Sequence, residues 1–209
     1  IKKKAESTGS SRVLFFNVNT DAAEPISRIG LPGMVSWLFK YPQPTVFSVE
    51  GDVRDSCLEL AMACDLIIAA DHVEFALPEM PLGIVPDAGA IQRLPRRLPY
   101  NIAMEMLLLG RRMPAEEAAR HGLVNAVVPA DTLMIRAREW ADQIANSAPL
   151  AVQTVKEVLR AIEGDTVEKA FQTMRTEDLP VYRKMLRSED AKEGVRAFVE
   201  KRKPVFRGE

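Results

Sequence analysis

Histidine, cysteine and aromatic residues are all scarce in this 209-residue sequence. The two histidines, His72 and His121, are too few for a metal site built on a histidine cluster. The two cysteines, Cys57 and Cys64, lie seven positions apart in one apolar segment with helical spacing. This arrangement favours reduced thiols in a core over a disulfide or a metal site. We therefore expect no bound metal.

The sequence also lacks a surplus of charge and a long apolar run. A formal net charge of −1 and a pI of about 6.3 give no basic surface for nucleic acid or an anionic membrane. The most apolar region, Leu58–Ala70, is interrupted by Glu59 and Asp65, so no membrane-spanning segment is expected. The first residues are basic and polar, unlike a signal peptide. We predict a cytoplasmic protein; a mitochondrial matrix location stays open, since a sequence can begin inside a longer protein.

Short apolar runs of β type alternate with helical patterns in the first hundred residues. Val13–Phe16, Thr45–Val49 and Leu66–Ala70 have the length and composition of strands, and Ser56–Cys64 between the last two has helical spacing. Uninterrupted apolar strands suit a sheet that is covered on both faces. The order strand, helix, strand therefore predicts an α/β fold with a parallel core over residues 1–100.

Residues 101–209 have almost entirely helical patterns, and we expect a separate helical region there. Pro149 suits a first helical turn, and Gly164 suits the end of the same helix. Between them Leu150, Val155, Val158, Leu159 and Ile162 form one apolar stripe with helical spacing. The charged tail Glu200–Glu209 is expected to be partly ordered, and only by contact with neighbours.

Two glutamates stand in strongly apolar segments. Glu59 lies within Cys57–Cys64, and Glu79 within Phe75–Leu82. Burial among such neighbours disfavours the charged form of a carboxylic acid and suits it to proton transfer near neutral pH. A solvent-facing glutamate, or one paired with an arginine, is the alternative interpretation of each. A turn-rich loop, Gly83–Ala90, follows Glu79, and loops of this kind on an α/β frame often shape a pocket.

Four stretches carry a more specific pattern. They are GDVRDSCLELAMACDLIIAAD from Gly51, FALPEMPLGIVPDAGAIQRLP from Phe75, GRRMPAEEAARHGLVNAVVP from Gly110 and SEDAKEGVRAFVEKRKPVFRG from Ser188. Together they cover about 80 of the 209 residues. In content and order they resemble the enoyl-CoA hydratase/isomerase, or crotonase, superfamily. Within it, the Gly83–Asp87 segment is most similar to carnitinyl-CoA dehydratases.

The resemblance implies a fold and a chemistry. The fold is a crotonase-like stacked ββα spiral followed by a C-terminal helical region. The family's two catalytic glutamates fall on Glu59 and Glu79, which would add or remove water across the α,β double bond of an enoyl-CoA thioester. The N–H groups of Ser56 and Thr20 would stabilise the oxyanion that develops on the thioester oxygen. The N–H of Asp87 would help to place the water.

The sequence departs from the family pattern in two places. Family members usually carry three small residues, mostly glycines, where this sequence has Asp55-Ser56-Cys57, and an inward-pointing Asp55 would oppose a developing oxyanion. The first oxyanion loop corresponds to Asn17–Asp21, which is shorter and has no glycine. Family domains also open with a β-hairpin and a helix that precede the first strand predicted here. A non-catalytic acyl-CoA-binding or structural protein is therefore one alternative function, and an enoyl-CoA isomerase is another.

The resemblance also implies partners. The substrate would be an acyl-CoA thioester of fatty acid metabolism, with coenzyme A entering as part of the substrate and no resident cofactor. Family members assemble as trimers or as dimers of trimers, so we expect a homotrimer or hexamer built through residues 101–209. The acyl-chain preference cannot be predicted, because Asp21–Pro44 shows little similarity to the family.

Overall fold

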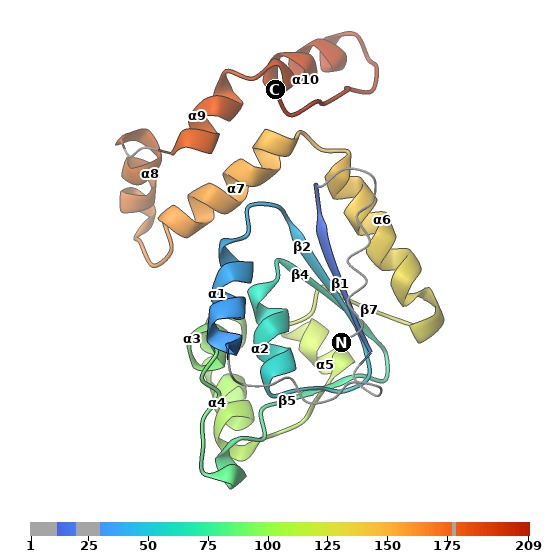
Figure 1. The fold of residues 1–209 in the computed structure, drawn as a ribbon, viewed down its shortest axis with the longest axis vertical. Coiled ribbons are helices and arrows are strands. Elements are labelled where there is room, and N and C mark those ends of the chain that lie inside the picture. The colour runs from blue at the N-terminus through green and yellow to red at the C-terminus, as the bar shows by residue number, and fades with distance from the viewer. Residues whose placement is uncertain (1–11, 20–29, 177–178) are drawn as a thin grey trace. The chain divides into compact units, whose positions relative to one another are not determined.

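The computed structural model describes residues 12–19, 30–176 and 179–209 (Figure 1). The chain divides into two compact units. The first comprises the described residues from Leu14 to Ala141 except Pro42–Pro44, and the second comprises Pro42–Pro44, the residues directly before Leu14 and Asp142–Glu209. Each unit has its own packing and is described separately.

The first unit is built on a four-stranded parallel sheet. Its strands, in spatial order, are β1 (Leu14–Asn19), β2 (Thr45–Glu50), β4 (Leu66–Ala70) and β7 (Ala126–Val128). The register pairs Leu14 with Thr45 and Val46 with Leu66. Nearly every side chain of β2 and β4 is buried, as a sheet covered on both faces requires. The predicted parallel core is therefore present.

A second, smaller sheet lies in the same unit. It consists of β3 (Val53–Arg54), β5 (Glu74–Ala76) and β6 (Met113–Pro114), in that order. β3 and β5 are parallel, with Val53 opposite Phe75 and Arg54 opposite Ala76, whereas β6 is antiparallel to β5. The chain therefore leaves β3 and β5 at the same end of this sheet.

Helices complete the first unit. They are α1 (Leu31–Lys40), α2 (Ser56–Ala63), η1 (Met80–Leu82), α3 (Ala90–Arg97), α4 (Tyr100–Leu109), α5 (Ala115–Arg120), η2 (Ala130–Thr132) and α6 (Leu133–Ala145), whose last residues belong to the second unit. All eight residues of α2 are buried, and α1 runs beside it (Figure 1). Helix α2 thus lies in the core of the unit, which explains its continuous apolar sequence.

The second unit is helical. Its helices are α7 (Pro149–Ala161), α8 (Val167–Thr176), α9 (Pro180–Leu186) and α10 (Glu189–Val199). Pro149 occupies the first turn of α7 as predicted, and α9 packs against α7. Of the apolar stripe on α7, Leu150 is buried, whereas Val155 and Leu159 are 59% and 60% exposed.

The C-terminal tail is held by its own chain. The Asp190 carboxylate accepts hydrogen bonds from the N–H groups of Arg207 and Gly208, both at 2.7 Å. The Arg12 guanidinium donates to the Phe206 carbonyl at 3.3 Å. The tail is therefore in contact with neighbouring residues of its own chain: Asp190, a buried carboxylate, holds the backbone of the last residues.

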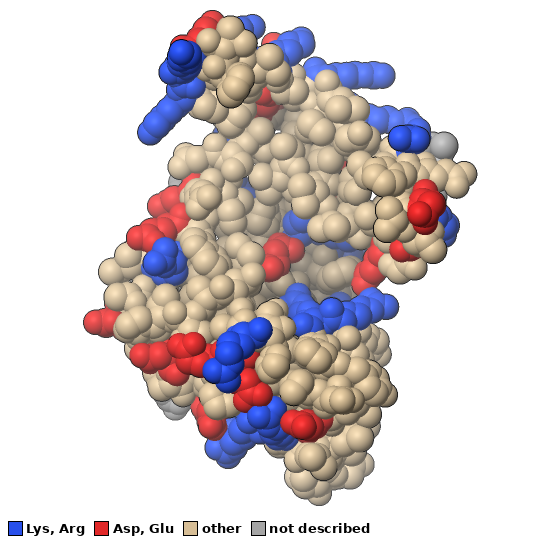
Figure 2. Space-filling model, turned by 180° about the vertical axis from the view of Figure 1, so that it is seen from behind, with Lys and Arg blue, Asp and Glu red and all other residues tan. Residues whose placement is uncertain are grey.

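The surface carries charges of both signs. On the face that Figure 2 shows, Lys and Arg side chains are interspersed with Asp and Glu side chains and with wide uncharged areas, in keeping with the net charge of −1. Within the described ranges, every helix is too short or too polar to cross a membrane. The same residues include no group of three or more His, Cys, Asp or Glu side chains that could hold a metal ion.

Candidate active site

The small sheet brings two distant segments together. Because β3 and β5 are parallel and in register, the segments that follow them begin at the same end of the sheet. A hydrogen bond of 3.3 Å from the Asp55 N–H to the Ala76 carbonyl joins them directly. The first turn of α2, which follows β3, and the segment Leu77–Glu79, which follows β5, therefore start side by side. The two glutamates singled out by the sequence lie on these two segments.

Glu59 lies in α2 and is 2% exposed. Its Oε1 atom accepts hydrogen bonds from the Ala88 N–H at 2.8 Å and the Ala90 N–H at 3.0 Å. These donors lie at the N-terminus of α3, where the helix dipole also favours a negative charge. Two backbone donors compensate in part for the burial of a carboxylate. The solvent-facing alternative is therefore excluded for Glu59, which is bound to the loop that follows Glu79.

Glu79 is 1% exposed and directly precedes η1. Both of its carboxylate oxygens are buried, and its backbone carbonyl accepts from the N–H groups of Leu82 and Ile84, at 2.9 and 3.4 Å. The end of α4 lies close to the backbone just before it, since a Cβ atom on Gly110 would lie 3.5 Å from Pro78 Cα. The solvent-facing alternative is excluded for Glu79 as well.

Ser56 is the first residue of α2 and lies one turn before Glu59. The first N–H groups of a helix have no acceptor within it, so the Ser56 N–H can serve a ligand at this end. The preceding residue, Asp55, has φ 50° and ψ −129°, which is the mirror image of the extended region. Glycine enters that region freely and other residues avoid it. Asp55 therefore occupies a glycine-like turn directly before the candidate donor.

The other candidate site residues are placed differently. Asp87 is exposed and directly precedes Ala88, whose N–H bonds to Glu59. The Asp87 N–H is therefore one residue from a donor that already reaches the glutamate. Thr20, the other expected oxyanion donor, lies outside the described residues. The structure thus connects Ser56 and Glu59 through α2, and Glu59 with the loop containing Asp87 through two hydrogen bonds. Glu79 lies three residues after Ala76, whose carbonyl accepts from the Asp55 N–H.

Cys57 and Cys64 are buried thiols that form no disulfide, as the sequence predicts. Burial raises the pKa of the Cys57 thiol to about 12, so the thiol is neutral at physiological pH. Because the thiolate is the nucleophilic form, this position in the first turn of α2 does not supply a nucleophile. The carboxylates of Glu59 and Glu79 are therefore the candidates for acid/base chemistry.

Sequence reasoning missed the two donors that hold Glu59. Ala88 and Ala90 contribute backbone N–H groups, and an alanine side chain gives no sign of such a role. The one available signal was Gly89 between them, which adopts φ 118° at the start of α3. A glycine at this position lets the loop turn so that both flanking N–H groups face one carboxylate oxygen.

Comparisons with known proteins identify the family of the chain. The family model described as enoyl-CoA hydratase/isomerase matches residues 21–209. The carnitinyl-CoA dehydratase of Proteus mirabilis is 50% identical over 179 residues, which are 86% of this chain and 68% of that protein. That of Citrobacter koseri is 48% identical over the same length.

Solved structures show the same relationship. An enoyl-CoA hydratase from Bacillus anthracis superposes with a TM-score of 0.80 at 35% identity, over 86% of this chain and 68% of that one. An enoyl-CoA hydratase subunit from Geobacillus kaustophilus gives a TM-score of 0.82 at 31% identity, over 97% and 83%. The chain has the crotonase fold, and the predicted fold class is confirmed. It belongs to the enoyl-CoA hydratase/isomerase family, and its resemblance to carnitinyl-CoA dehydratases is confirmed.

Proposed function

We propose that this protein is an acyl-CoA hydratase or dehydratase, a lyase that adds or removes water across the α,β double bond of an enoyl-CoA thioester. The observation that carries the proposal is the pair of buried glutamates, Glu59 and Glu79, on the two segments that leave one end of the small sheet. Burying a carboxylic acid costs folding free energy, and buried titratable groups cluster at functional sites. Two buried glutamates on adjacent segments therefore favour a chemical role. The family and the carnitinyl-CoA dehydratase relatives point to the same reaction.

In the proposed hydration, Glu59 and Glu79 hold one water between them. One carboxylate takes a proton from the water while the water oxygen bonds to the β-carbon of the substrate. The electron pair of the double bond moves toward the thioester, so negative charge develops on the thioester oxygen. The other glutamate gives its proton to the α-carbon, and dehydration is the reverse. The two carboxyl groups together neither gain nor lose a proton.

Charge on the thioester oxygen needs donors that are already in place. We assign the Ser56 N–H as one donor and the Thr20 N–H as the other, with the Asp87 N–H placing the water. A preorganised donor contributes about 3 to 4 kcal/mol to transition-state stabilisation in comparable sites. The position of Ser56 at the start of a helix supports its assignment, because the helix dipole adds to the N–H group.

The test follows the ultraviolet absorbance of the enoyl thioester with crotonyl-CoA and with crotonobetainyl-CoA. We expect turnover by the unchanged protein and a loss of 100- to 10,000-fold in kcat for Glu79→Gln and for Glu59→Gln, the usual contribution of an acid or base. Gln keeps the size and removes the titrating group. An unchanged kcat in both variants would contradict the acid/base pair, and no turnover of either thioester would contradict the activity.

One observation favours a second candidate, a non-catalytic acyl-CoA-binding or structural protein. Asp55, an acidic and half-buried residue, directly precedes Ser56, the candidate donor to the developing charge. Binding of a saturated acyl-CoA without turnover of either enoyl thioester would favour this candidate. An isomerase, which needs only one of the glutamates, would instead shift the double bond of a 3-enoyl-CoA and tolerate one of the two glutamine substitutions.

We also propose that the protein forms a homotrimer or hexamer through its C-terminal helices. Apolar side chains are exposed on α7 and α8, where Val155, Leu159, Val167 and Phe171 are each more than half exposed in the single chain. Val155 and Leu159, and likewise Val167 and Phe171, are spaced to share one helix face. Exposed apolar area of this kind marks a contact surface.

We propose a cytoplasmic location because the two cysteines are reduced. Cys57 and Cys64 are both reduced thiols, and reduced cysteines are the rule in the cytosol. A fusion to a fluorescent protein, followed by fractionation, tests the location. Recovery with a membrane or secreted fraction would contradict it.

A further inference from the structure

Helices α2 and α3 are bonded to each other at two places. At the start of α3, the N–H groups of Ala88 and Ala90 donate to the Glu59 carboxylate of α2. At the end of α3, the Arg97 guanidinium donates to the Met62 carbonyl at 2.8 Å and to the Cys64 carbonyl at 3.2 Å. These two carbonyls belong to the C-terminal end of α2. The bonds that hold the candidate catalytic glutamate therefore have a counterpart at the opposite end of α3.

The chemistry of the two links is complementary. A carboxylate meets the N-terminus of one helix, and a guanidinium meets the C-terminus of the other, as the helix dipoles favour. Arg97 is half-buried, and burial is the main cause that lowers the pKa of its guanidinium, while the neighbouring Cys64 and Asp65 act in the opposite direction. A half-buried cation needs acceptors, and the carbonyls of Met62 and Cys64 provide them.

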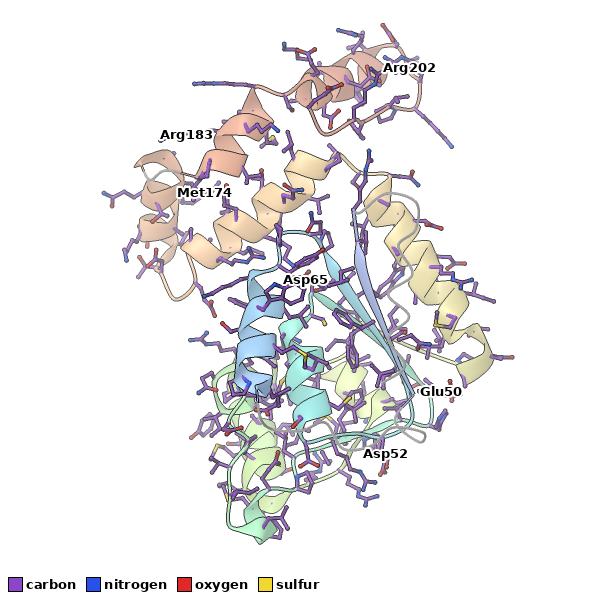
Figure 3. The ribbon with its side chains drawn as sticks, viewed as in Figure 1. Glu50, Asp52, Asp65, Met174, Arg183 and Arg202 are labelled. Carbon is purple, nitrogen blue, oxygen red and sulfur yellow. The ribbon has the colours of Figure 1, made fainter. Side chains whose placement is uncertain are left out.

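Helix α2 is fixed independently of α3. Asp65, labelled in Figure 3, directly follows the C-cap residue of α2 and accepts from the Thr45 N–H at 2.7 Å and the Thr45 hydroxyl at 2.8 Å. The Asp65 N–H donates in turn to the Thr45 hydroxyl at 2.9 Å. This end of α2 is therefore attached to the first residue of the buried strand β2. Arg97 therefore bonds α3 to an end of α2 that is itself attached to β2.

We propose that Arg97 is a positioning residue for Glu59. By bonding the last carbonyls of α2, it holds α3 where the N–H groups of Ala88 and Ala90 reach the Glu59 carboxylate. The link acts at the end of α3 opposite the two N–H groups, so it adds to the bonds that the glutamate itself makes with this helix. The inference rests on the proposed function in so far as Glu59 takes part in the reaction.

The kinetic test compares Arg97→Ala, Arg97→Lys and Arg96→Ala. Misplacing a catalytic group by about 1 Å costs about 100-fold, so we expect Arg97→Ala to lower kcat by 10- to 100-fold, with KM changed less than about twofold. Arg97→Lys keeps a cation that reaches one of the carbonyls and should recover most of kcat. Arg96→Ala, a change of the exposed neighbour on the same helix, should leave both constants near those of the unchanged protein.

A second measurement does not depend on activity. Amide hydrogen exchange at Ala88 and Ala90 reports directly on the two bonds to Glu59, and Arg97→Ala should raise both rates about tenfold or more. The amides of β2 and β4 serve as the internal reference, because global destabilisation would raise their rates equally. Exchange that is unchanged at Ala88 and Ala90, or raised equally in the strands, would overturn the proposal. So would a lower kcat that Arg97→Lys does not restore.

The two measurements also separate this inference from the proposed function. If the unchanged protein turns over neither thioester, the proposed function fails. Faster exchange confined to Ala88 and Ala90 in Arg97→Ala would still support the role of Arg97 in holding α3. If the protein is active and Arg97→Ala retains full kcat, the positioning role alone fails.

Discussion

Among single residues, Asp55 has the backbone conformation least suited to its side chain. A non-glycine residue in such a region costs about 1 to 3 kcal/mol. We expect Asp55→Gly to raise the free energy of unfolding by about 1 kcal/mol in urea titrations, since part of the gain is offset by the greater freedom of glycine in the unfolded chain. The variant also removes a negative charge next to the Ser56 N–H, so kcat should rise severalfold.

Two control variants separate these effects. Asp55→Asn removes the charge and keeps the strained backbone, so it should raise kcat without raising stability. Among the described residues other than glycine, Lys201 also has a positive φ, 53°. Lys201→Gly should relieve the strain there and leave kcat unchanged. A less stable Asp55→Gly protein would contradict the assignment of strain to this residue.

A second prediction at the residue scale concerns the reactivity of the Cys57 thiol. Because its pKa is raised to about 12, the folded state favours the neutral thiol, so this group destabilises the fold only as the pH rises above its usual value of 9.0 toward 12. We expect Cys57 to resist iodoacetamide at pH 8 in the folded protein and to react promptly in urea. Mass spectrometry of the alkylated protein checks this, and rapid labelling without denaturant would contradict the burial.

At the scale of elements, the sequence predicted strands and helices better than it predicted contacts. Leu66–Ala70 and the helix from Ser56 were predicted almost to the residue, because buried elements have uniform apolar composition. The hydrogen-bond partners of Glu59 could not be predicted, because they are backbone N–H groups and the side-chain pattern does not identify them. Arg97 was equally hidden, because the carbonyl of Met62 lies 35 residues away in the chain. Local patterns carry little information about such distant pairs.

The C-terminal tail makes an element-scale prediction about pH. The Arg202 side chain is the main cause that lowers the pKa of Glu193 to about 2, with the Val205 N–H as the second cause. A carboxyl group whose pKa is lowered stabilises the folded tail above its usual value of 4.5 and loses that effect as the pH falls toward 2. We expect amide exchange at Val205, corrected for its intrinsic pH dependence, to accelerate between these values.

The matched variant is Glu193→Gln, which should show fast exchange at Val205 at neutral pH and no further acceleration in acid. Asp190 holds Arg207 and Gly208, so at neutral pH those two amides serve as a reference beyond the affected contact. If Val205 exchanged at the same corrected rate at pH 6 and at pH 2.5, the ion pair would have no part in holding the tail.

For the whole molecule, the pattern of exposure argues for assembly. The apolar stripe expected on α7 exists in the sequence, yet Val155 and Leu159 are exposed in the single chain. A periodic pattern identifies a face that avoids water but does not reveal whether the same chain or another copy covers it. We expect the unchanged protein to elute at the mass of a trimer or hexamer, measured by light scattering during gel filtration.

Leu159→Glu tests this surface directly, because a charge buried in an interface without a partner is strongly unfavourable. The variant should elute as a monomer at micromolar concentration while circular dichroism shows unchanged helix content. Glu139→Ala, which removes an exposed carboxylate from α6, should leave the mass unchanged. A monomeric unchanged protein would contradict the proposed assembly. An oligomer that Leu159→Glu leaves intact would place its contacts away from α7, because a copy packed on this helix could not accommodate the charge.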